Sequence, residues 1–126
     1  MSIFDHTGFA VGDFDTSAAF YDAALAPLGI KRAVEFEYPG GKVIGYGVER
    51  PEFWLNTGGA LRDRIHLAFA ASTRAQVDAF YKAAMAAGGR DNGGPGIREQ
   101  YSPNYYAAFV LDPDGHNIEA VCHAAE

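Results

Sequence analysis

The sequence predicts an α+β fold made of two tandem βαβββ modules, whose strands form a curled mixed sheet. Three observations lead to this fold class: an internal repeat, a strand-then-helix pattern that opens each copy, and a turn motif that makes the last two strands a hairpin. The chain has 126 residues, of which 48% are hydrophobic and 21% are charged. A chain of this length and composition is expected to fold as one globular domain, residues 1–126.

The internal repeat becomes visible when the sequence is shifted by 60 residues without a gap. The shift places His6 on His66, Phe9 on Phe69, Phe20-Tyr21 on Phe80-Tyr81 and Gly29 on Gly89. These matches are informative, whereas the alanine matches in this alanine-rich chain are not. Because a fixed period constrains the architecture more strongly than local propensity does, we predict a first module over about residues 1–57 and a second over about 61–123.

Hydrophobic periodicity places the elements of each module. The helices are expected to begin after Asp13 or Asp15 and after Ser72 or Thr73, which can cap them, and to run to residues 25 and 87. The predicted strands are 3–11, 31–37, 43–48 and 52–56 in the first copy, and 65–71, 105–111 and 117–122 in the second. The remaining strand of the second copy is expected within the glycine-rich residues 90–101.

The motif Asp112-Pro-Asp-Gly115 predicts a tight turn. Proline suits the second position of such a turn, and glycine adopts the left-handed backbone conformation that the turn requires. The last two strands should therefore form a hairpin, with Glu119 in the middle of the final strand.

Alternation of side chains along the strands defines the faces of the sheet. His6 shares its face with Gly8 and Ala10, and His66 shares its face with Ala68 and Ala70. The bulky residues lie on the opposite face, where they can pack under the helices. Each imidazole therefore lies beside a hollow, and a carboxylate from Glu119 facing that hollow would be costly without a cation.

Two histidines at equivalent repeat positions and a mid-strand glutamate form the ligand set of the facial triad used by Fe(II) and Mn(II) enzymes. We therefore predict a metal site at His6, His66 and Glu119. A single strand histidine is more often a hydrogen-bonded structural residue, so the prediction depends on the three residues together. His116 in the turn and His123 near the chain end are expected to be solvated.

The lone cysteine, Cys122, lies in an apolar run near the C-terminus. It is expected to be a small buried hydrophobic residue, because one cysteine cannot form an internal disulfide.

Two stretches resemble the vicinal oxygen chelate superfamily, which includes glyoxalases, bleomycin-resistance proteins and extradiol dioxygenases. The opening stretch Asp5-His6-Thr-Gly-Phe-Ala-Val-Gly-Asp13, with Ser17-Ala-Ala-Phe-Tyr21, is similar to the first strand and helix of that superfamily. The closing stretch Ala108-Phe-Val-Leu-Asp-Pro-Asp-Gly-His-Asn-Ile-Glu119 is similar to its last hairpin. The resemblance implies paired βαβββ modules that curl around a metal or ligand cleft, with the metal bound by His6, His66 and Glu119.

One position departs from the glyoxalase I pattern. There the fourth strand of the first module supplies a further ligand, and here Trp54 stands in that register. An indole cannot ligate a metal in this role, and Glu52 would replace it only if the register slipped by two residues. Three protein ligands resemble the extradiol dioxygenases and the thiol-transfer resistance enzymes more than lactoylglutathione lyase.

The resemblance implies a small-molecule metalloenzyme, either a glyoxalase-like lyase or isomerase or an extradiol-type dioxygenase. One divalent metal ion (Fe, Mn, Ni, Zn or Co) would chelate and polarise vicinal oxygens of the substrate, with Glu119 as the catalytic residue. Trp54, Arg98 and one of Tyr105 and Tyr106 are candidates for substrate binding, although core packing or solvation explains such residues equally well. Of the two tyrosines, Tyr106 is the better candidate, because it shares strand parity with Ala108.

Two other functions stay open: a metal-free binding protein that sequesters an aromatic ligand at a dimer groove, and a non-catalytic regulatory module. A homodimer is expected, because single-chain members of the superfamily usually pair. If the modules are exchanged between chains, His6 comes from one chain and His66 with Glu119 from the other; the sequence leaves both arrangements open. The formal net charge of −6 argues against nucleic acid as a partner, since clustered basic residues are lacking. No apolar run is long enough to span a membrane and no secretory segment is evident, so a cytoplasmic location is expected.

Overall fold

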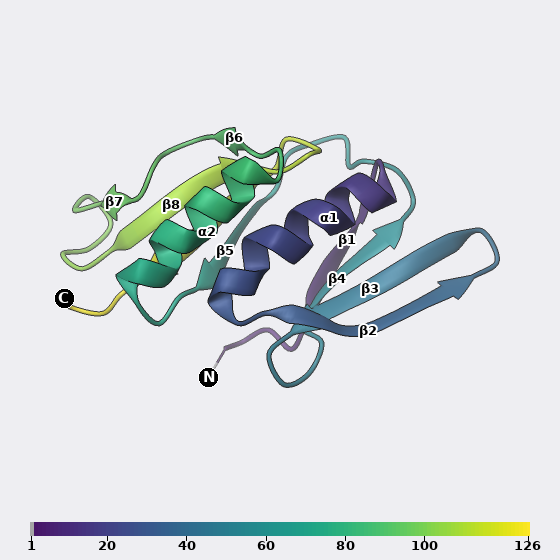
Figure 1. The fold of residues 1–126 in the computed structure, drawn as a ribbon, viewed down its shortest axis with the longest axis horizontal. Coiled ribbons are helices and arrows are strands. Elements are labelled where there is room, and N and C mark those ends of the chain that lie inside the picture. The colour runs from purple at the N-terminus through teal and green to yellow at the C-terminus, as the bar shows by residue number, and fades with distance from the viewer. Residues whose placement is uncertain (1) are drawn as a thin grey trace.

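The computed structural model describes residues 2–126 and has an α+β architecture with two curled mixed sheets and two long helices (Figure 1). Met1, the first residue of the predicted first module, lies outside the described residues. The elements are, in chain order, β1 (Thr7–Val11), α1 (Phe14–Leu25), the short 3₁₀ helix η1 (Ala26–Leu28), β2 (Lys31–Tyr38), β3 (Gly41–Gly47), β4 (Phe53–Thr57), β5 (His66–Ala70), α2 (Arg74–Ala86), β6 (Arg90–Asp91), β7 (Gly96–Ile97), β8 (Tyr106–Leu111) and β9 (Asn117–Cys122).

The two halves of the chain have the same strand topology. The first sheet has the order β1-β4-β3-β2 and the second β5-β9-β8-β6, with β7 also paired to β8. In each half the first strand is parallel to the last, and the last is antiparallel to the strand before it. The predicted fold class is confirmed. Within residues 2–126 the strands form two sheets that share no strand pair.

The element boundaries agree with the hydrophobic pattern except at two places. The first strand begins at Thr7, so His6 precedes the strand instead of lying within it. The second is the glycine-rich stretch, which yields two strands of two residues each. Asn92 and Gly93 still exchange backbone hydrogen bonds with Phe109 of β8, and Gly94 and Pro95 then separate them from the next pair at Gly96.

Side chains cap both helices as the sequence predicts. Asp13 accepts a hydrogen bond from the backbone N–H of Thr16 (3.0 Å), and Thr73 accepts one from the backbone N–H of Gln76 (3.1 Å). The bond from Thr16 lowers the pKa of the Asp13 carboxyl. Neither helix, within the described part of the chain, is long and apolar enough to cross a bilayer.

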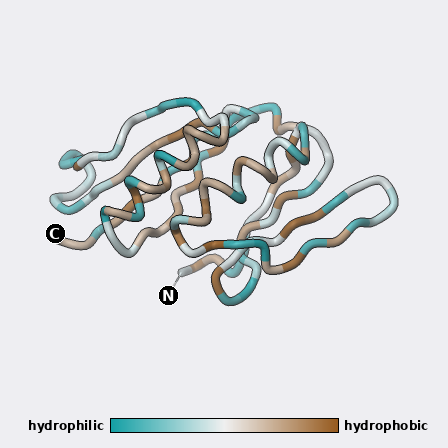
Figure 2. The backbone as a smooth tube through the Cα atoms, viewed as in Figure 1, coloured by the Kyte–Doolittle hydropathy of each residue, from teal (hydrophilic) through white to brown (hydrophobic). Residues whose placement is uncertain are grey.

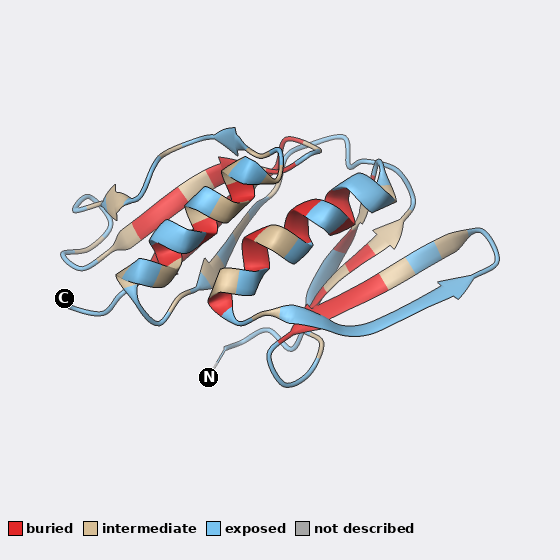
Figure 3. Cartoon of the chain, in the orientation of Figure 1, coloured by how far each residue is buried: buried red, intermediate tan, exposed pale blue. Residues whose placement is uncertain are grey.

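The core lies between the helices and the sheets. Both helices pack on the same side of the molecule and contact each other (Figure 1). Their inward sides are buried (Figure 3), and hydrophobic and hydrophilic residues alternate along both helices (Figure 2). Phe20 and Phe80, which are equivalent in the repeat, are both fully buried there.

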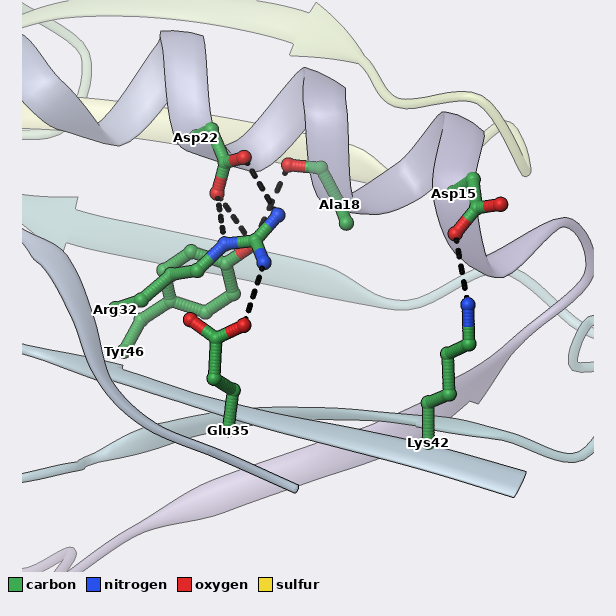
Figure 4. Close-up of polar contacts among 7 residues, drawn as sticks. All are labelled: Asp15, Ala18, Asp22, Arg32, Glu35, Lys42 and Tyr46. Carbon is green, nitrogen blue, oxygen red and sulfur yellow. Dashed lines mark hydrogen bonds and ion pairs between the residues drawn. The ribbon is translucent and has the colours of Figure 1, made fainter. Parts of the chain in front are cut away.

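A polar cluster holds the outer strand β2 to α1 (Figure 4). Arg32 donates two hydrogen bonds to Asp22, at 2.9 and 2.7 Å, and one to Glu35 at 3.3 Å. The Tyr46 hydroxyl donates to Asp22 at 3.0 Å, and burial, followed by the charge of Asp22, raises the pKa of Tyr46. Every member of this cluster has a partner, which is consistent with a structural clamp.

The predicted turn between β8 and β9 forms and joins the two halves of the chain. The N–H of Gly115 donates to the carbonyl of Asp112 (2.9 Å), and Gly115 has a positive φ of 88°. From the first half, the hydroxyl of Tyr21 donates to the buried carboxylate of Asp112 (2.5 Å), and the N–H of Gly12 donates to Asp114 (3.1 Å). The turn is therefore also a docking contact between the modules.

Candidate metal centre

The structure brings two of the three predicted ligands into direct contact. Strand β5 is parallel to β9 with Ala68 opposite Glu119, so His66 and Glu119 share the sheet face that points away from α2. Nε2 of His66 lies 2.7 Å from Oε1 of Glu119. The glutamate is only 1% exposed, whereas the imidazole is about half exposed. Because a carboxylate only accepts, Nε2 of His66 carries the proton in this contact.

The second oxygen of the Glu119 carboxylate also has a partner. The hydroxyl of Tyr105 donates a hydrogen bond to Oε2. Burial, together with this bond and the charge of Glu119, raises the pKa of Tyr105 to about 12. The hydroxyl therefore stays protonated near neutral pH and remains a donor. Phe109, which is opposite Glu119 on β8, places its ring 6.3 Å from that of His66.

His6 lies apart from this pair. Its Nδ1 donates to Oδ1 of Asp5 at 2.8 Å, and Arg50 approaches the other oxygen of Asp5 at 3.4 Å. β1 and β5 run in opposite directions (Figure 1). His6 comes just before β1 and His66 begins β5, so the two histidines lie toward opposite ends of these two strands. Among residues 2–126, no three His, Cys, Asp or Glu side chains are close enough to hold a metal ion.

A cleft of about 570 Å³ lies between the two modules, and both histidines line it. One wall includes Thr7 and Phe53 of the first sheet, and the other includes Leu67 and Phe69 of β5. The cleft therefore combines apolar walls with two imidazoles, which suits a small organic ligand.

Trp54 occupies the position in the first module that Glu119 occupies in the second. It is opposite Gly8 on β1, as Glu119 is opposite Ala68 on β5. A Cβ atom added at Gly8 would lie 2.7 Å from the Cβ of Trp54, and one added at Gly45 would lie 2.8 Å from its ring. Glycine at both positions therefore makes room for the indole on this sheet face.

The two other residues predicted to bind substrate have different surroundings. The hydroxyl of Tyr106 donates to Asp78 of α2 at 2.6 Å, which places Tyr106 on the helix side of the sheet, away from Glu119. The guanidinium of Arg98 lies 5.3 Å from the centre of the Phe109 ring and donates to the carbonyl of Gly94 at 2.7 Å. Arg98 is thus linked to His66 through one aromatic ring.

His116 corrects one prediction, because it is 1% exposed instead of solvated. Its Nδ1 accepts a hydrogen bond from the N–H of Ile65 at 3.1 Å, and its ring contacts Phe9 across the module boundary. His123 is exposed and Cys122 is buried, as predicted. Sequence reasoning named both Tyr105 and Tyr106 but preferred Tyr106, and it did not identify Phe109. Tyr105, just before β8, and Phe109 are four residues apart and so share a strand face, which was the signal available in the sequence.

The donor atoms in contact suit a first-row divalent metal. Zn²⁺ and similar ions bind imidazole nitrogen and carboxylate oxygen at about 2.0–2.2 Å, so two adjacent ligand atoms lie about 3 Å apart. The measured 2.7 Å between Nε2 of His66 and Oε1 of Glu119 is close to this spacing. One chain therefore brings together an imidazole and a carboxylate, two donor types that first-row metals bind, and the 2.7 Å contact is also an ordinary hydrogen bond.

Comparisons with known proteins agree with this fold. The family model of the Glyoxalase/Bleomycin resistance protein/Dioxygenase superfamily matches residues 3–120. A glyoxalase/bleomycin resistance protein from Albidiferax ferrireducens T118 is 30% identical, with a TM-score of 0.73 over 96% of this chain and 98% of that one. No match was found among curated proteins.

Two more distant solved structures share the fold alone. A mutant of glyoxalase I from Zea mays is 21% identical, with a TM-score of 0.72 over 94% of this chain and 46% of that one. A mutant of the fosfomycin resistance protein FosX from Listeria monocytogenes, complexed with Mn(II) and a dihydroxypropylphosphonic acid, is 19% identical. Its TM-score is 0.71 over 100% of this chain and 94% of that one.

Proposed function

Because the chain belongs to the Glyoxalase/Bleomycin resistance protein/Dioxygenase superfamily, we propose that it is a small-molecule metalloenzyme, a glyoxalase-like lyase or isomerase or an extradiol-type dioxygenase. The observation that carries the proposal is the contact of His66 with the buried carboxylate of Glu119. Both oxygens of this buried carboxylate have a hydrogen-bond partner, and a divalent cation bound by His66 and Glu119 would supply the paired charge that a buried carboxylate also requires.

The third ligand in this proposal is His6 of a second copy of the chain. His66 and Glu119 lie together, whereas His6 lies outside their group. The sheet faces that carry these residues expose small residues such as Gly8 and Ala68. Phe36 is 51% exposed and pairs with Val43, on the same sheet. A homodimer that joins the first module of one chain to the second module of the other would cover such faces and complete the site.

When bound, the divalent metal (Fe, Mn, Ni, Zn or Co) would supply Lewis acidity toward two neighbouring oxygens of the substrate. The residues of the chain prepare that site. Nε2 of His66 must be free of its proton before it can ligate, and a neutral imidazole achieves this by carrying the proton on Nδ1 instead. Glu119 is proposed as the ligand that acts in catalysis.

The walls of the site set what the substrate can be. Trp54 leaves the first module without a carboxylate or amide at the fourth ligand position, which keeps coordination positions open for substrate oxygens. Arg98, stacked on Phe109, is placed to pair with an anionic group of a substrate held near His66. An oxygenated, anionic small molecule with an aromatic or apolar part fits these surroundings.

A metal-free binding protein is the second candidate, favoured by the cleft of about 570 Å³ with its apolar walls. Such a protein would bind an aromatic ligand by apolar contact and would not need His66 and Glu119 as a pair. The metal content of the protein distinguishes the two functions.

The deciding experiment is metal analysis of protein purified without chelators, followed by calorimetric titration of Mn(II), Fe(II), Ni(II) and Zn(II). Wild-type protein is expected to bind one metal per chain, and His66→Ala and Glu119→Gln are expected to weaken binding by more than the ~10–100-fold typical of changes around a ligand. Trp54→Ala is the control and should keep the metal.

The identity of the bound metal and the oxygen uptake also distinguish a dioxygenase from a lyase or isomerase. Bound iron with oxygen uptake on catechols would support the dioxygenase, and nickel, zinc or cobalt without uptake would support the lyase or isomerase. Wild-type protein that takes up no metal, or His66→Ala with wild-type affinity, would leave the metal-free binding protein as the function.

A further inference from the structure

We propose that Tyr105 is a positioning residue that restricts Glu119 to one metal-binding oxygen. The inference rests on the proposed metal function and goes beyond it, because it concerns a residue outside the three ligands. Its hydroxyl would hold Oε2 of the carboxylate and leave Oε1, beside His66, as the ligand atom.

The two oxygens of Glu119 have different partners. Oε1 lies 2.7 Å from Nε2 of His66, and Oε2 accepts a hydrogen bond from Tyr105. Because the residue is only 1% exposed, water does not compete for either oxygen. The carboxylate is therefore fixed in one rotational state by a donor on each side.

The strand β8 explains how a tyrosine ring can reach this carboxylate. Tyr105, Ala107 and Phe109 alternate onto one face, and Ala107 is opposite Val121 while Phe109 is opposite Glu119. Alanine between two aromatic residues leaves space for the Tyr105 ring to lie along the sheet. The rings of Tyr101 and His123, at 5.0 and 5.2 Å, contact Tyr105 from its other sides.

The hydrogen bond from Tyr105 affects how Glu119 can bind a metal. A free carboxylate can bind a divalent cation through one oxygen or through both. A hydroxyl that stays bonded to Oε2 disfavours the two-oxygen mode, so one more coordination position stays open for substrate. The same bond keeps the ligand oxygen in place beside His66, as hydrogen bonds to ligating carboxylates do in other metal sites.

The test compares Tyr105→Phe with the wild type and with Tyr101→Phe. Phenylalanine keeps the ring packing and removes only the hydroxyl, whereas Tyr101 has a ring contact with Tyr105 but no bond to Glu119. Calorimetric titration of Co(II) and Mn(II) is expected to show a loss of affinity of about 10–100-fold for Tyr105→Phe and no change for Tyr101→Phe. The visible absorption of the Co(II) form should also change for Tyr105→Phe alone.

Infrared spectroscopy of the wild-type protein tests the role of Tyr105 without depending on the folding of a variant. The infrared difference spectrum between metal-free and Zn(II)-loaded protein should show the wide separation of carboxylate stretches that marks one-oxygen ligation. A narrow separation, or a Tyr105→Phe variant with wild-type affinity and Co(II) spectrum, would overturn the role of Tyr105 while the metal function stands. Wild-type protein without metal binding would instead overturn the proposed function itself.

Discussion

The two histidines of the proposed site differ in what holds their rings. His66 is oriented by Glu119 across neighbouring strands, whereas His6 is oriented by the adjacent Asp5. The hydrogen bond with His6, and then the charge of Arg50, lowers the pKa of Asp5, so this carboxyl stays ionised at neutral pH. An ionised Asp5 that accepts from Nδ1 leaves Nε2 of His6 as the nitrogen for a metal, a common arrangement around ligating histidines.

Asp5→Ala is therefore expected to weaken divalent-metal binding by about 10-fold or more, because the His6 ring loses the partner that sets its tautomer and orientation. Asp5→Asn keeps an acceptor oxygen and should lose less. Calorimetric titration of Mn(II) measures both affinities. Asp15→Ala, which changes an exposed carboxylate paired with Lys42, is the matched control. Equal affinity of Asp5→Ala and wild type would show that Asp5 does not orient a ligand.

Tyr21 on α1 and Tyr81 on α2 occupy equivalent positions of the repeat but have different surroundings. Tyr21 on α1 is fully buried and donates to Asp112 in the turn of the other module. Tyr81 on α2 donates to the exposed Asp91 of its own module, at 3.0 Å. Burial, followed by the charge of Asp112, raises the pKa of Tyr21 well above its ordinary value, so its hydroxyl remains a donor throughout the accessible pH range.

Tyr21→Phe is expected to lower the free energy of unfolding by about 1–3 kcal/mol, because it leaves a buried carboxylate oxygen of Asp112 without its donor. Tyr81→Phe should cost less, since water can replace the lost partner of Asp91. Urea denaturation followed by circular dichroism gives both values. A loss at Tyr21 no larger than the loss at Tyr81 would mean that this contact does not stabilise the joined modules.

The sequence was sufficient to predict most of the elements, because the signals that define them are local. The alternation of residues 117–122, the caps Asp13 and Thr73 and the turn at Gly115 depend only on nearby residues. The pairing of His66 with Glu119 followed from the repeat together with the hairpin. The choice between Tyr105 and Tyr106 was missed, because parity alone does not tell which face of β8 packs under α2.

The position of His6 relative to His66 could not be predicted from the sequence, which allowed a site within one chain and a site shared by two chains. Which modules face each other depends on the packing of α1 against α2, and no local pattern records it. The turn at Asp112 and the contact of Phe9 with His116 set that packing from residues far apart in the sequence. The separation of His6 from His66 is a result of the tertiary arrangement.

If each metal site joins two chains, mixing two inactive variants should restore part of the binding. His6→Ala and His66→Ala are each expected to form dimers without a complete site, while a mixed dimer contains one intact pair of His6 from one chain and His66 from the other. After denaturation and refolding of an equal mixture, roughly a quarter of the wild-type sites should bind metal, because about half of the dimers are mixed.

Mn(II) bound per chain, measured after gel filtration, gives the fraction of restored sites. The control is an equal mixture of His66→Ala and Glu119→Gln, which lose ligands from the same half of the site. No recovery in the first mixture, or equal recovery in both, would contradict a site shared between chains.

The exposed edge strand β2 affects how readily this protein aggregates in concentrated solution. Its outer edge presents backbone N–H and C=O groups, and Val34, Phe36 and Tyr38 are each more than a third exposed. Such an edge can recruit strands from other molecules and start aggregation, which many proteins prevent by placing charges there. Here Lys31, Arg32, Glu35 and Glu37 provide those charges, and the bonds from Arg32 to Asp22 keep the strand attached to α1. High salt or acid weakens the ion pair between Arg32 and Asp22. Either condition is therefore expected to promote aggregation through β2 before the core unfolds.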